Sequence, residues 1–132
     1  MKELKFKKCM ICGTVVEVLE GNGKLICCGQ EMTDLIPNSV EASFEKHIPT
    51  YEVENNQMKV QVNHVMEDNH YIEWILVQTP NQMYKKEFHP GDTPFMEAPY
   101  EKGSIIYAYC NLHGLWTVSY THLRAHETRR HL

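Results

Sequence analysis

Four cysteines near the start of the chain restrict its fold more than any other feature. Cys9 and Cys12 form a C-x-x-C pair, Cys27 and Cys28 are adjacent, and a glycine follows each pair. Four thiolates on two hairpin-linked turns make a tetrahedral sulfur site suited to zinc or iron. The glycines fit tight backbone turns around the sulfur atoms. We therefore expect a small metal-binding module in this part of the chain.

The adjacent cysteines raise a geometric problem, because neighbouring side chains on a strand point to opposite faces. Cys27 and Cys28 can reach one metal only if the backbone bends locally, and we expect this bend to distort the tetrahedron. The residues alone leave three interpretations open: four buried reduced cysteines, a structural zinc knuckle, or a redox iron centre.

The chain of 132 residues is long enough for one ordinary domain or two small ones. It has no apolar run of about 18 residues, which predicts no transmembrane helix. The segment MKELKFKKC has a basic start without an apolar stretch, which predicts no signal peptide. We therefore expect a cytoplasmic protein, where clustered cysteines are metal ligands more often than disulfides. The formal net charge of −4 gives no sign of nucleic-acid binding.

Short alternating segments predict β-strands along most of the chain. TVVEVLEGNGKLICC predicts two strands joined by a turn at residues 21–23, and TYEVENNQMKVQVNHVM predicts a hairpin that turns at residues 55–56. HYIEWILVQT and SIIYAYC are rich in β-branched and aromatic residues, while HPGDTP predicts a turn. Residues 34–50 are interpreted as linker and loop. This pattern indicates a small antiparallel sandwich or barrel.

A second group of metal-binding residue types is spread over three segments, EKHIP, NHVMEDNHYIEWI and CNLHGLW, which supply His47, His64, His70, Cys110 and His113. Together with the amino-terminal cysteines, these segments resemble desulfoferrodoxin, the two-iron superoxide reductase. The resemblance covers roughly residues 5–116, and its motifs occur in family order. Val65 stands where the family usually has a proline.

The resemblance implies a role for each of these residues. The first iron would be bound by Cys9, Cys12, Cys27 and Cys28. The catalytic iron would be bound by His47, His64, His70 and His113 in one plane, with Cys110 as the axial thiolate. Glu45 and Lys46 match the loop pair beside the open sixth position of that iron.

The chemistry of these residue types agrees with the implied roles. Imidazole and thiolate suit iron, and five protein ligands on an octahedral ion leave one position for a small substrate. Zinc prefers four ligands, which argues against zinc in the second site. A lysine near the open position can attract an anion such as superoxide.

The resemblance also implies the architecture and the reaction. It predicts an all-β chain, with a desulforedoxin-like β-hairpin iron module at residues 1–36 and an immunoglobulin-like antiparallel β-sandwich with the catalytic iron at residues 37–117. The predicted reaction is the one-electron reduction of superoxide to hydrogen peroxide, with a rubredoxin-like electron donor. A homodimer is expected, without nucleic-acid or membrane partners. A non-catalytic iron electron-transfer protein and a zinc-knuckle interaction module are the alternative functions.

The last 15 residues differ in composition from the rest of the chain. The ten basic residues before Trp116 are all lysines, whereas all three arginines fall in the final nine positions. VSYTHLRAHET, which begins at Val118, resembles translated sequencing-adapter fragments. We therefore expect residues 118–132 to be a non-native tail that can be deleted without loss of iron or activity; the alternative is a natural basic tail.

Overall fold

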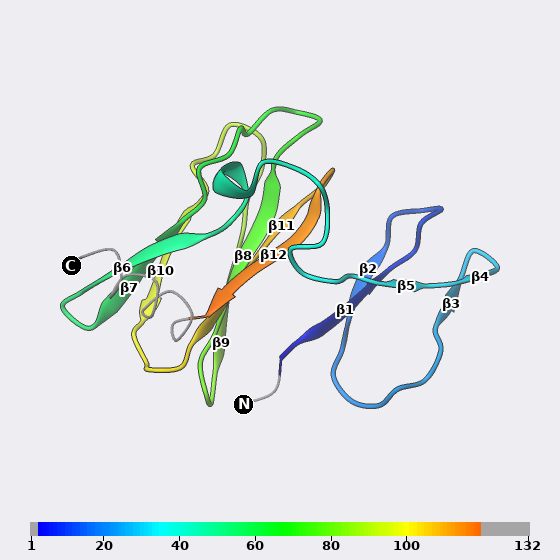
Figure 1. Ribbon diagram of the computed structural model, residues 1–132, viewed down its shortest axis with the longest axis horizontal. Helices are drawn as coiled ribbons and strands as arrows, with labels where there is room; N and C mark the ends of the chain where they lie inside the picture. The colour runs from blue at the N-terminus through cyan, green and yellow to red at the C-terminus, as the bar shows by residue number, and fades with distance from the viewer. Residues whose placement is uncertain (1–2, 120–132) are drawn as a thin grey trace. The chain divides into compact units, whose positions relative to one another are not determined.

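The structure is a computed structural model that describes residues 3–119. The chain divides into two compact units, Met1–Ile36 and Pro37–Leu132. Within the described residues, one short 3-10 helix accompanies the β-strands, so the prediction of an all-β chain is confirmed (Figure 1). No helix in this part of the chain has the length and apolar character needed to cross a membrane.

The first unit contains two small antiparallel sheets. Their strands are β1 (Lys5–Lys8), β2 (Val15–Val18) and β5 (Thr33–Asp34), in the order β2-β1-β5, and the pair β3 (Ile26–Cys27) and β4 (Gln30–Glu31). The hairpin predicted across residues 21–23 is wrong, because β2 pairs with β1 and β3 pairs with β4. The lysine-rich sequence of β1 is not typical of a strand. In the structure, β1 is nevertheless the central strand of its sheet, pairs with β2 and buries the side chain of Phe6.

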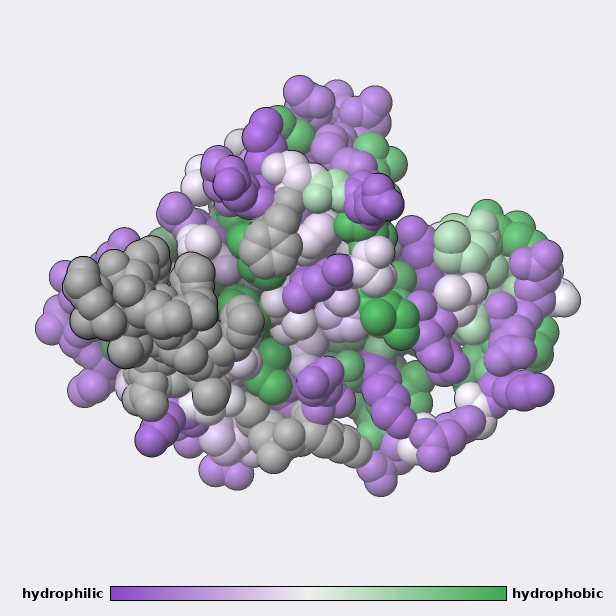
Figure 2. Space-filling view, in the orientation of Figure 1, coloured by the Kyte–Doolittle hydropathy of each residue, from purple (hydrophilic) through white to green (hydrophobic). Residues whose placement is uncertain are grey.

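The first unit buries few large side chains. Its buried hydrophobic residues are Phe6, Cys9 and Met32. Apolar side chains reach its surface instead (Figure 2), and five of them are between 58% and 68% exposed: Met10, Ile11, Leu19, Ile26 and Ile36. A unit of this size seldom folds on its hydrophobic core alone and usually needs a metal, disulfides or oligomerisation.

The second unit is an antiparallel β-sandwich, as predicted. One sheet has the order β10-β7-β6, from β6 (Thr50–Glu54), β7 (Gln57–Gln61) and β10 (Phe95–Pro99). The other has the order β12-β11-β8-β9, from β8 (Ile72–Gln78), β9 (Met83–Glu87), β11 (Ile105–Cys110) and β12 (Gly114–Ser119). Both sheets contribute to one core, which includes Met58, Val60, Ile75 and Ile106.

The hairpin of β6 and β7 turns at the predicted residues. Asn55 and Asn56 have φ angles of 53° and 63°. A two-residue hairpin turn with positive φ at both positions matches the right-handed twist of the flanking strands, and asparagine tolerates that conformation well. The prediction of this hairpin is therefore confirmed.

A β-bulge changes the direction of side chains where β8 runs beside the end of β11. Cys110 pairs with Ile72, whereas the residue before Cys110 pairs with Trp74, so Glu73 is the extra residue. Regular alternation from Ile75 would turn Glu73 inward. The bulge instead places Ile72 in the core beside Cys110, in keeping with the frequent occurrence of bulges next to functional sites.

The last described strand extends past the boundary predicted for the tail. β12 continues through Val118 and Ser119, and Val118 is buried in the core opposite Ile106. The interpretation of residues 118–132 as a non-native tail stays a prediction, because valine and serine fit a strand whatever their origin. Residues 120–132, with His122, His126 and His131, lie outside the described residues.

Two truncations should behave differently. Removing residues 118–132 takes the Val118 side chain out of the core and should lower the free energy of unfolding of the second unit by about 1.5–3 kcal/mol. Removing residues 120–132 should leave it unchanged within about 0.5 kcal/mol. Denaturant unfolding of the two truncated proteins and the full chain measures the difference. A large loss in the shorter truncation would contradict a dispensable tail.

Candidate metal centres

Four histidine rings from distant parts of the second unit form a square. Neighbouring ring centroids are 4.6 Å apart for His47–His64, 4.6 Å for His64–His70, 5.0 Å for His70–His113 and 4.8 Å for His113–His47. His47 and His70 lie across the square from each other, 6.4 Å apart. Neighbouring rings meet edge to face at 70–88°. The ring nitrogens can therefore converge on one central point.

Cys110 supplies a sulfur atom to the same point. Its Sγ is 3.4 Å from His64 Nε2 and 4.0 Å from His113 Nδ1. These two histidines occupy opposite corners of the square, so the sulfur lies near its axis. The five donor atoms are all within 4.8 Å of one another. Cys110 is fully buried, which leaves its sulfur atom little access to water.

A short 3-10 helix, η1 (Phe44–Lys46), leads directly into His47. The Nδ1–H of His47 donates a hydrogen bond of 2.7 Å to the Ser43 carbonyl oxygen, which leaves the Nε2 lone pair pointing toward the centre. Burial lowers the pKa of His47, with smaller contributions in the same direction from His113 and His70. The imidazole is therefore neutral at pH 7, the form that binds metal.

His64 and His70 lie in the loop between β7 and β8, and this loop is held at its centre by Met66. The backbone N–H of Ile72 donates to Met66 Sδ at 3.4 Å, and the N–H of Gly91 donates to the Met66 carbonyl at 2.8 Å. The Nδ1–H of His64 donates to a neighbouring carbonyl at 2.5 Å, which directs Nε2 inward. Burial also lowers the pKa of His64, so its ring is neutral as well.

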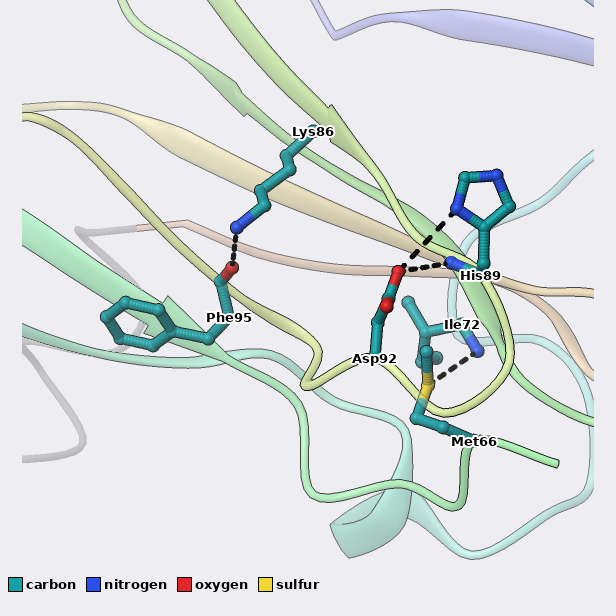
Figure 3. Close-up of polar contacts among 6 residues, drawn as sticks. All are labelled: Met66, Ile72, Lys86, His89, Asp92 and Phe95. Carbon is teal, nitrogen blue, oxygen red and sulfur yellow. Dashed lines mark hydrogen bonds and ion pairs between the residues drawn. The ribbon is translucent and has the colours of Figure 1, made fainter.

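The turn at residues 89–92 contacts this loop through the hydrogen bond from Gly91 to Met66, and Figure 3 shows the side chains of His89, Asp92 and Met66 in this region. Its own closure depends on Asp92 Oδ2, which accepts the backbone N–H of His89 at 2.7 Å and lies 3.7 Å from His89 Nδ1. Nearby, Lys86 Nζ donates to the Phe95 carbonyl at 3.2 Å and links the edges of the two sheets. The side chain of His89 is 86% exposed, in keeping with the turn predicted for HPGDTP.

Cys110 and His113 are held by the tight connection between β11 and β12. Gly114 has a φ of 81°, a conformation that glycine adopts without steric cost and that suits a three-residue hairpin loop. The backbone N–H of His113 donates to Cys110 Sγ at 3.4 Å. The Asn111 side chain accepts the Tyr71 N–H at 2.9 Å and donates to the Asn69 carbonyl at 3.1 Å. Asn111 therefore ties this turn to the loop of His64 and His70.

The distances within the square fit a bound metal ion. Two nitrogens at adjacent corners of an octahedral ion, with bonds of about 2.1 Å, lie about 3 Å apart. His47 Nε2 is 3.0 Å from His113 Nδ1 and 3.2 Å from His64 Nε2. His70 Nε2 is buried without a hydrogen-bond partner in the described structure. A central metal would satisfy this nitrogen, which is otherwise costly to bury.

The four amino-terminal cysteines meet in the first unit. Cys28 and Gly29 form the two-residue turn between β3 and β4, with φ angles of 54° and 76°. The left-handed conformation of Cys28 provides the predicted local bend and lets its side chain reach the same point as that of Cys27. On the other side, the N–H of Gly13 donates to the Cys9 carbonyl at 2.9 Å and closes the C-x-x-C turn.

The sulfur positions fit a tetrahedral metal. Sulfurs around one ion with bonds of about 2.3 Å lie about 3.8 Å apart. Cys12 Sγ is 3.6 Å from Cys27 Sγ, which is 4.0 Å from Cys28 Sγ, so the expected distortion is small at these positions. The Thr14 hydroxyl lowers the pKa of Cys12 to about 6, whereas proton sharing with Cys12 and Cys9 raises the pKa of Cys27 to about 12. A cation is needed before all four can be thiolates.

Known protein families match both units of the chain. The Desulfoferrodoxin family matches residues 39–119, and the Desulfoferrodoxin N-terminal domain matches residues 2–35. The chain belongs to the desulfoferrodoxin family. Its group of four cysteines and its group of four histidines with one cysteine match the two iron sites of a desulfoferrodoxin, as predicted. We call them the four-cysteine site and the histidine–cysteine site.

Relatives of this desulfoferrodoxin cover most of its length. A desulfoferrodoxin homolog from Methanothermobacter thermautotrophicus is 42% identical over 115 residues, 83% of this chain and 93% of the relative. The desulfoferrodoxin of Syntrophotalea carbinolica is 41% identical over 121 residues, 88% and 96% of the two chains. The solved superoxide reductase from Treponema pallidum is 27% identical with a TM-score of 0.69, over 89% of this chain and 99% of that chain.

The nine residues predicted as iron ligands meet in two groups, four in the first unit and five in the second. Glu45 and Lys46 lie exposed on η1, next to the buried His47. Two residues that contact the ligand-bearing segments, Asn111 and Trp116, carry no metal-binding group and were not predicted from the sequence. An asparagine directly after a predicted ligand in a turn could have indicated the first of these.

Proposed function

We propose that this desulfoferrodoxin is a superoxide reductase, an enzyme that reduces superoxide to hydrogen peroxide without oxidising a second superoxide. The observation that carries the proposal is the convergence of four imidazoles and one buried thiolate on a single point. The family and the superoxide reductase fold of the Treponema pallidum protein support a redox enzyme. A site for a small anion requires no large pocket.

We assign the nine converging residues as iron ligands. The first iron is held by Cys9, Cys12, Cys27 and Cys28, and the second by His47, His64, His70, Cys110 and His113. When bound, ferrous iron at the second site supplies the electron that converts one superoxide and two protons to hydrogen peroxide.

The protein residues around this site prepare it for that step. As a thiolate, Cys110 would donate electron density to a bound iron, and its burial would keep water from weakening that effect. The carbonyl oxygen that accepts the Nδ1–H of His47 fixes its tautomer and raises the basicity of the ring as a ligand. Lys46, exposed next to His47, carries a positive charge that would attract superoxide to the histidine–cysteine site.

The test combines a metal count with the stoichiometry of the reaction. Anaerobically purified protein should contain two irons per chain, and the reduced protein should yield one peroxide per superoxide consumed. A dismutase would also release one dioxygen for every two superoxide ions. Zinc in both sites would contradict the proposal, and so would iron-loaded protein that does not consume superoxide.

Replacing Lys46 with alanine should slow the capture of superoxide without removing iron. Two unit charges about 4–6 Å apart near a protein surface interact by a few kcal/mol before screening. The second-order rate should therefore fall about tenfold, and its dependence on salt should flatten. Pulse-generated superoxide, reacted with ferrous protein at several ionic strengths, measures both effects.

Two further variants control this measurement. Lys102→Ala removes the same charge from an exposed turn just before β11. Cys110, which belongs to the histidine–cysteine site, lies at the opposite end of that strand, so this variant removes a charge away from the site. It should leave the rate nearly unchanged. Glu45→Ala should affect steps after capture, because a carboxylate does not attract superoxide. Equal rates and salt slopes for Lys46→Ala and the parent protein would show that the η1 loop is only a solvated surface.

The electron donor, the assembly and the compartment are also part of this proposal. We expect a rubredoxin-like protein to return an electron to the site after each turnover. A homodimer is supported by the exposed apolar side chains of the first unit, which a second copy could cover. Cysteine-rich metal sites without disulfides agree with a cytoplasmic location. Sedimentation of the metal-loaded protein measures the oligomeric state.

A further inference from the structure

The indole ring of Trp116 is buried against the histidine square. The residue lies in β12 and is 2% exposed. Its ring stacks on the imidazole of His47, with centroids 4.9 Å apart and an interplanar angle of 21°. This contact covers one face of the imidazole and restricts its rotation. None of the nine assigned ligands comes from β12, so Trp116 is the strand's contribution to the site.

The same indole also makes a hydrogen bond to the turn that carries the thiolate. Trp116 Nε1–H donates to the His113 carbonyl oxygen at 3.1 Å. His47 and His113 are 66 positions apart in the chain, and their ring nitrogens are 3.0 Å apart. One side chain therefore contacts two of the ligand-bearing segments by two different interactions.

We propose that Trp116 is a positioning residue that holds the His47 ring and the Cys110–His113 turn in the geometry that binds iron. A histidine that follows a short 3-10 turn has little secondary structure of its own to fix its ring. The stack supplies that restraint from one side, and the hydrogen bond to the Ser43 carbonyl supplies it from another. Without the indole, the imidazole could turn away from the centre.

The stack also has an electrostatic consequence. The face of an indole ring is electron-rich, and it attracts groups that carry positive charge. An imidazole bound to a cation is electron-poor, and it is more so when that cation is ferric rather than ferrous. Trp116 therefore stabilises the ferric state more than the ferrous state, and its removal should raise the midpoint potential of the second iron.

The test uses the full-length, iron-loaded chain and three variants. Trp116→Leu removes both contacts, Trp116→Phe keeps a ring but lacks the N–H donor, and Trp74→Leu is the matched control. Trp74 is the other of the two tryptophans and is also buried, but it stacks on Tyr109 at 5.6 Å. The measurements are ferrous-iron affinity by competition with a chelator, the midpoint potential of the second iron, and thermal unfolding.

Trp116→Leu should weaken iron binding at the histidine–cysteine site by about 10–100-fold, the usual effect of losing a residue that orients a ligand. It should also raise the midpoint potential and leave the iron of the four-cysteine site bound. Trp116→Phe should lie between this variant and the parent. Trp74→Leu should lower the unfolding temperature and leave affinity and potential unchanged.

Equal shifts of affinity and potential in Trp116→Leu and Trp74→Leu would overturn the proposal, because a general loss of packing would explain both. If Trp116→Leu does not fold, unchanged affinity and potential in Trp116→Phe would overturn it instead. The inference rests on the proposed function in taking iron as the metal, but none of its measurements uses superoxide. Shifted affinity in a protein that fails to consume superoxide would therefore overturn the proposed function alone.

Discussion

Replacing Cys110 with serine should abolish superoxide turnover and leave the first iron bound. Serine offers a hard, protonated oxygen where a soft thiolate donates charge to iron. Loss of a residue that only orients a ligand costs about 10–100-fold, so loss of the ligand itself should cost at least about 100-fold in rate. The two sites share no residue, and the four-cysteine site is untouched. Pulse-generated superoxide and metal analysis measure the two effects.

Ala108→Ser is the matched control for that substitution. Ala108 lies two residues earlier on β11, faces the same core and is almost fully buried. It tests the cost of placing a serine hydroxyl in this part of the sandwich without touching a ligand. A parental rate of superoxide reduction in Cys110→Ser would show that the assignment of the thiolate is wrong.

The metal-binding groups could be predicted from sequence because few residue types bind metals and their order in the chain is specific. The family order of the segments around His47, His64 and Cys110 allowed three distant loops to be combined into one site. The bend at Cys28 also followed from a general rule, since two adjacent strand residues cannot face one metal. The left-handed φ of Cys28 shows how the chain makes that bend.

Other features depend on contacts that a local pattern does not reveal. The segment KFKK is more charged than a typical strand, yet it pairs between β2 and β5 and buries the side chain of Phe6. The bulge at Glu73 depends on how β8 and β11 align, and neither strand shows it alone. Trp116 looks like an ordinary core residue until His47, far away in the chain, is placed against it. Each of these results from pairing between distant segments, which alternation within one segment cannot predict.

Cys12→Ser should remove the first iron and unfold the first unit. That unit has about 36 residues and buries only Phe6, Cys9 and Met32 as large or apolar groups in its described part. A core this small usually supports a fold only with a metal, disulfides or oligomerisation, and the described cysteines of this unit form no disulfide. Structural zinc in zinc-finger peptides contributes about 10–16 kcal/mol to folding, whereas three buried side chains at about 1.5–3 kcal/mol each contribute less than that.

The second unit should survive the loss of the first, because it has its own core and its own ligands. In Cys12→Ser, hydrogen exchange should become fast within residues 3–36 and stay slow in β8 and β11, and one iron per chain should remain. Met10→Ser is the control, since Met10 is exposed in the same turn and is not a ligand.

The direct reaction of ferrous Cys12→Ser protein with superoxide should keep its parental rate, because the electron comes from the second iron. A rate that falls with the first iron while the second stays bound would mean that each electron must pass through the four-cysteine site.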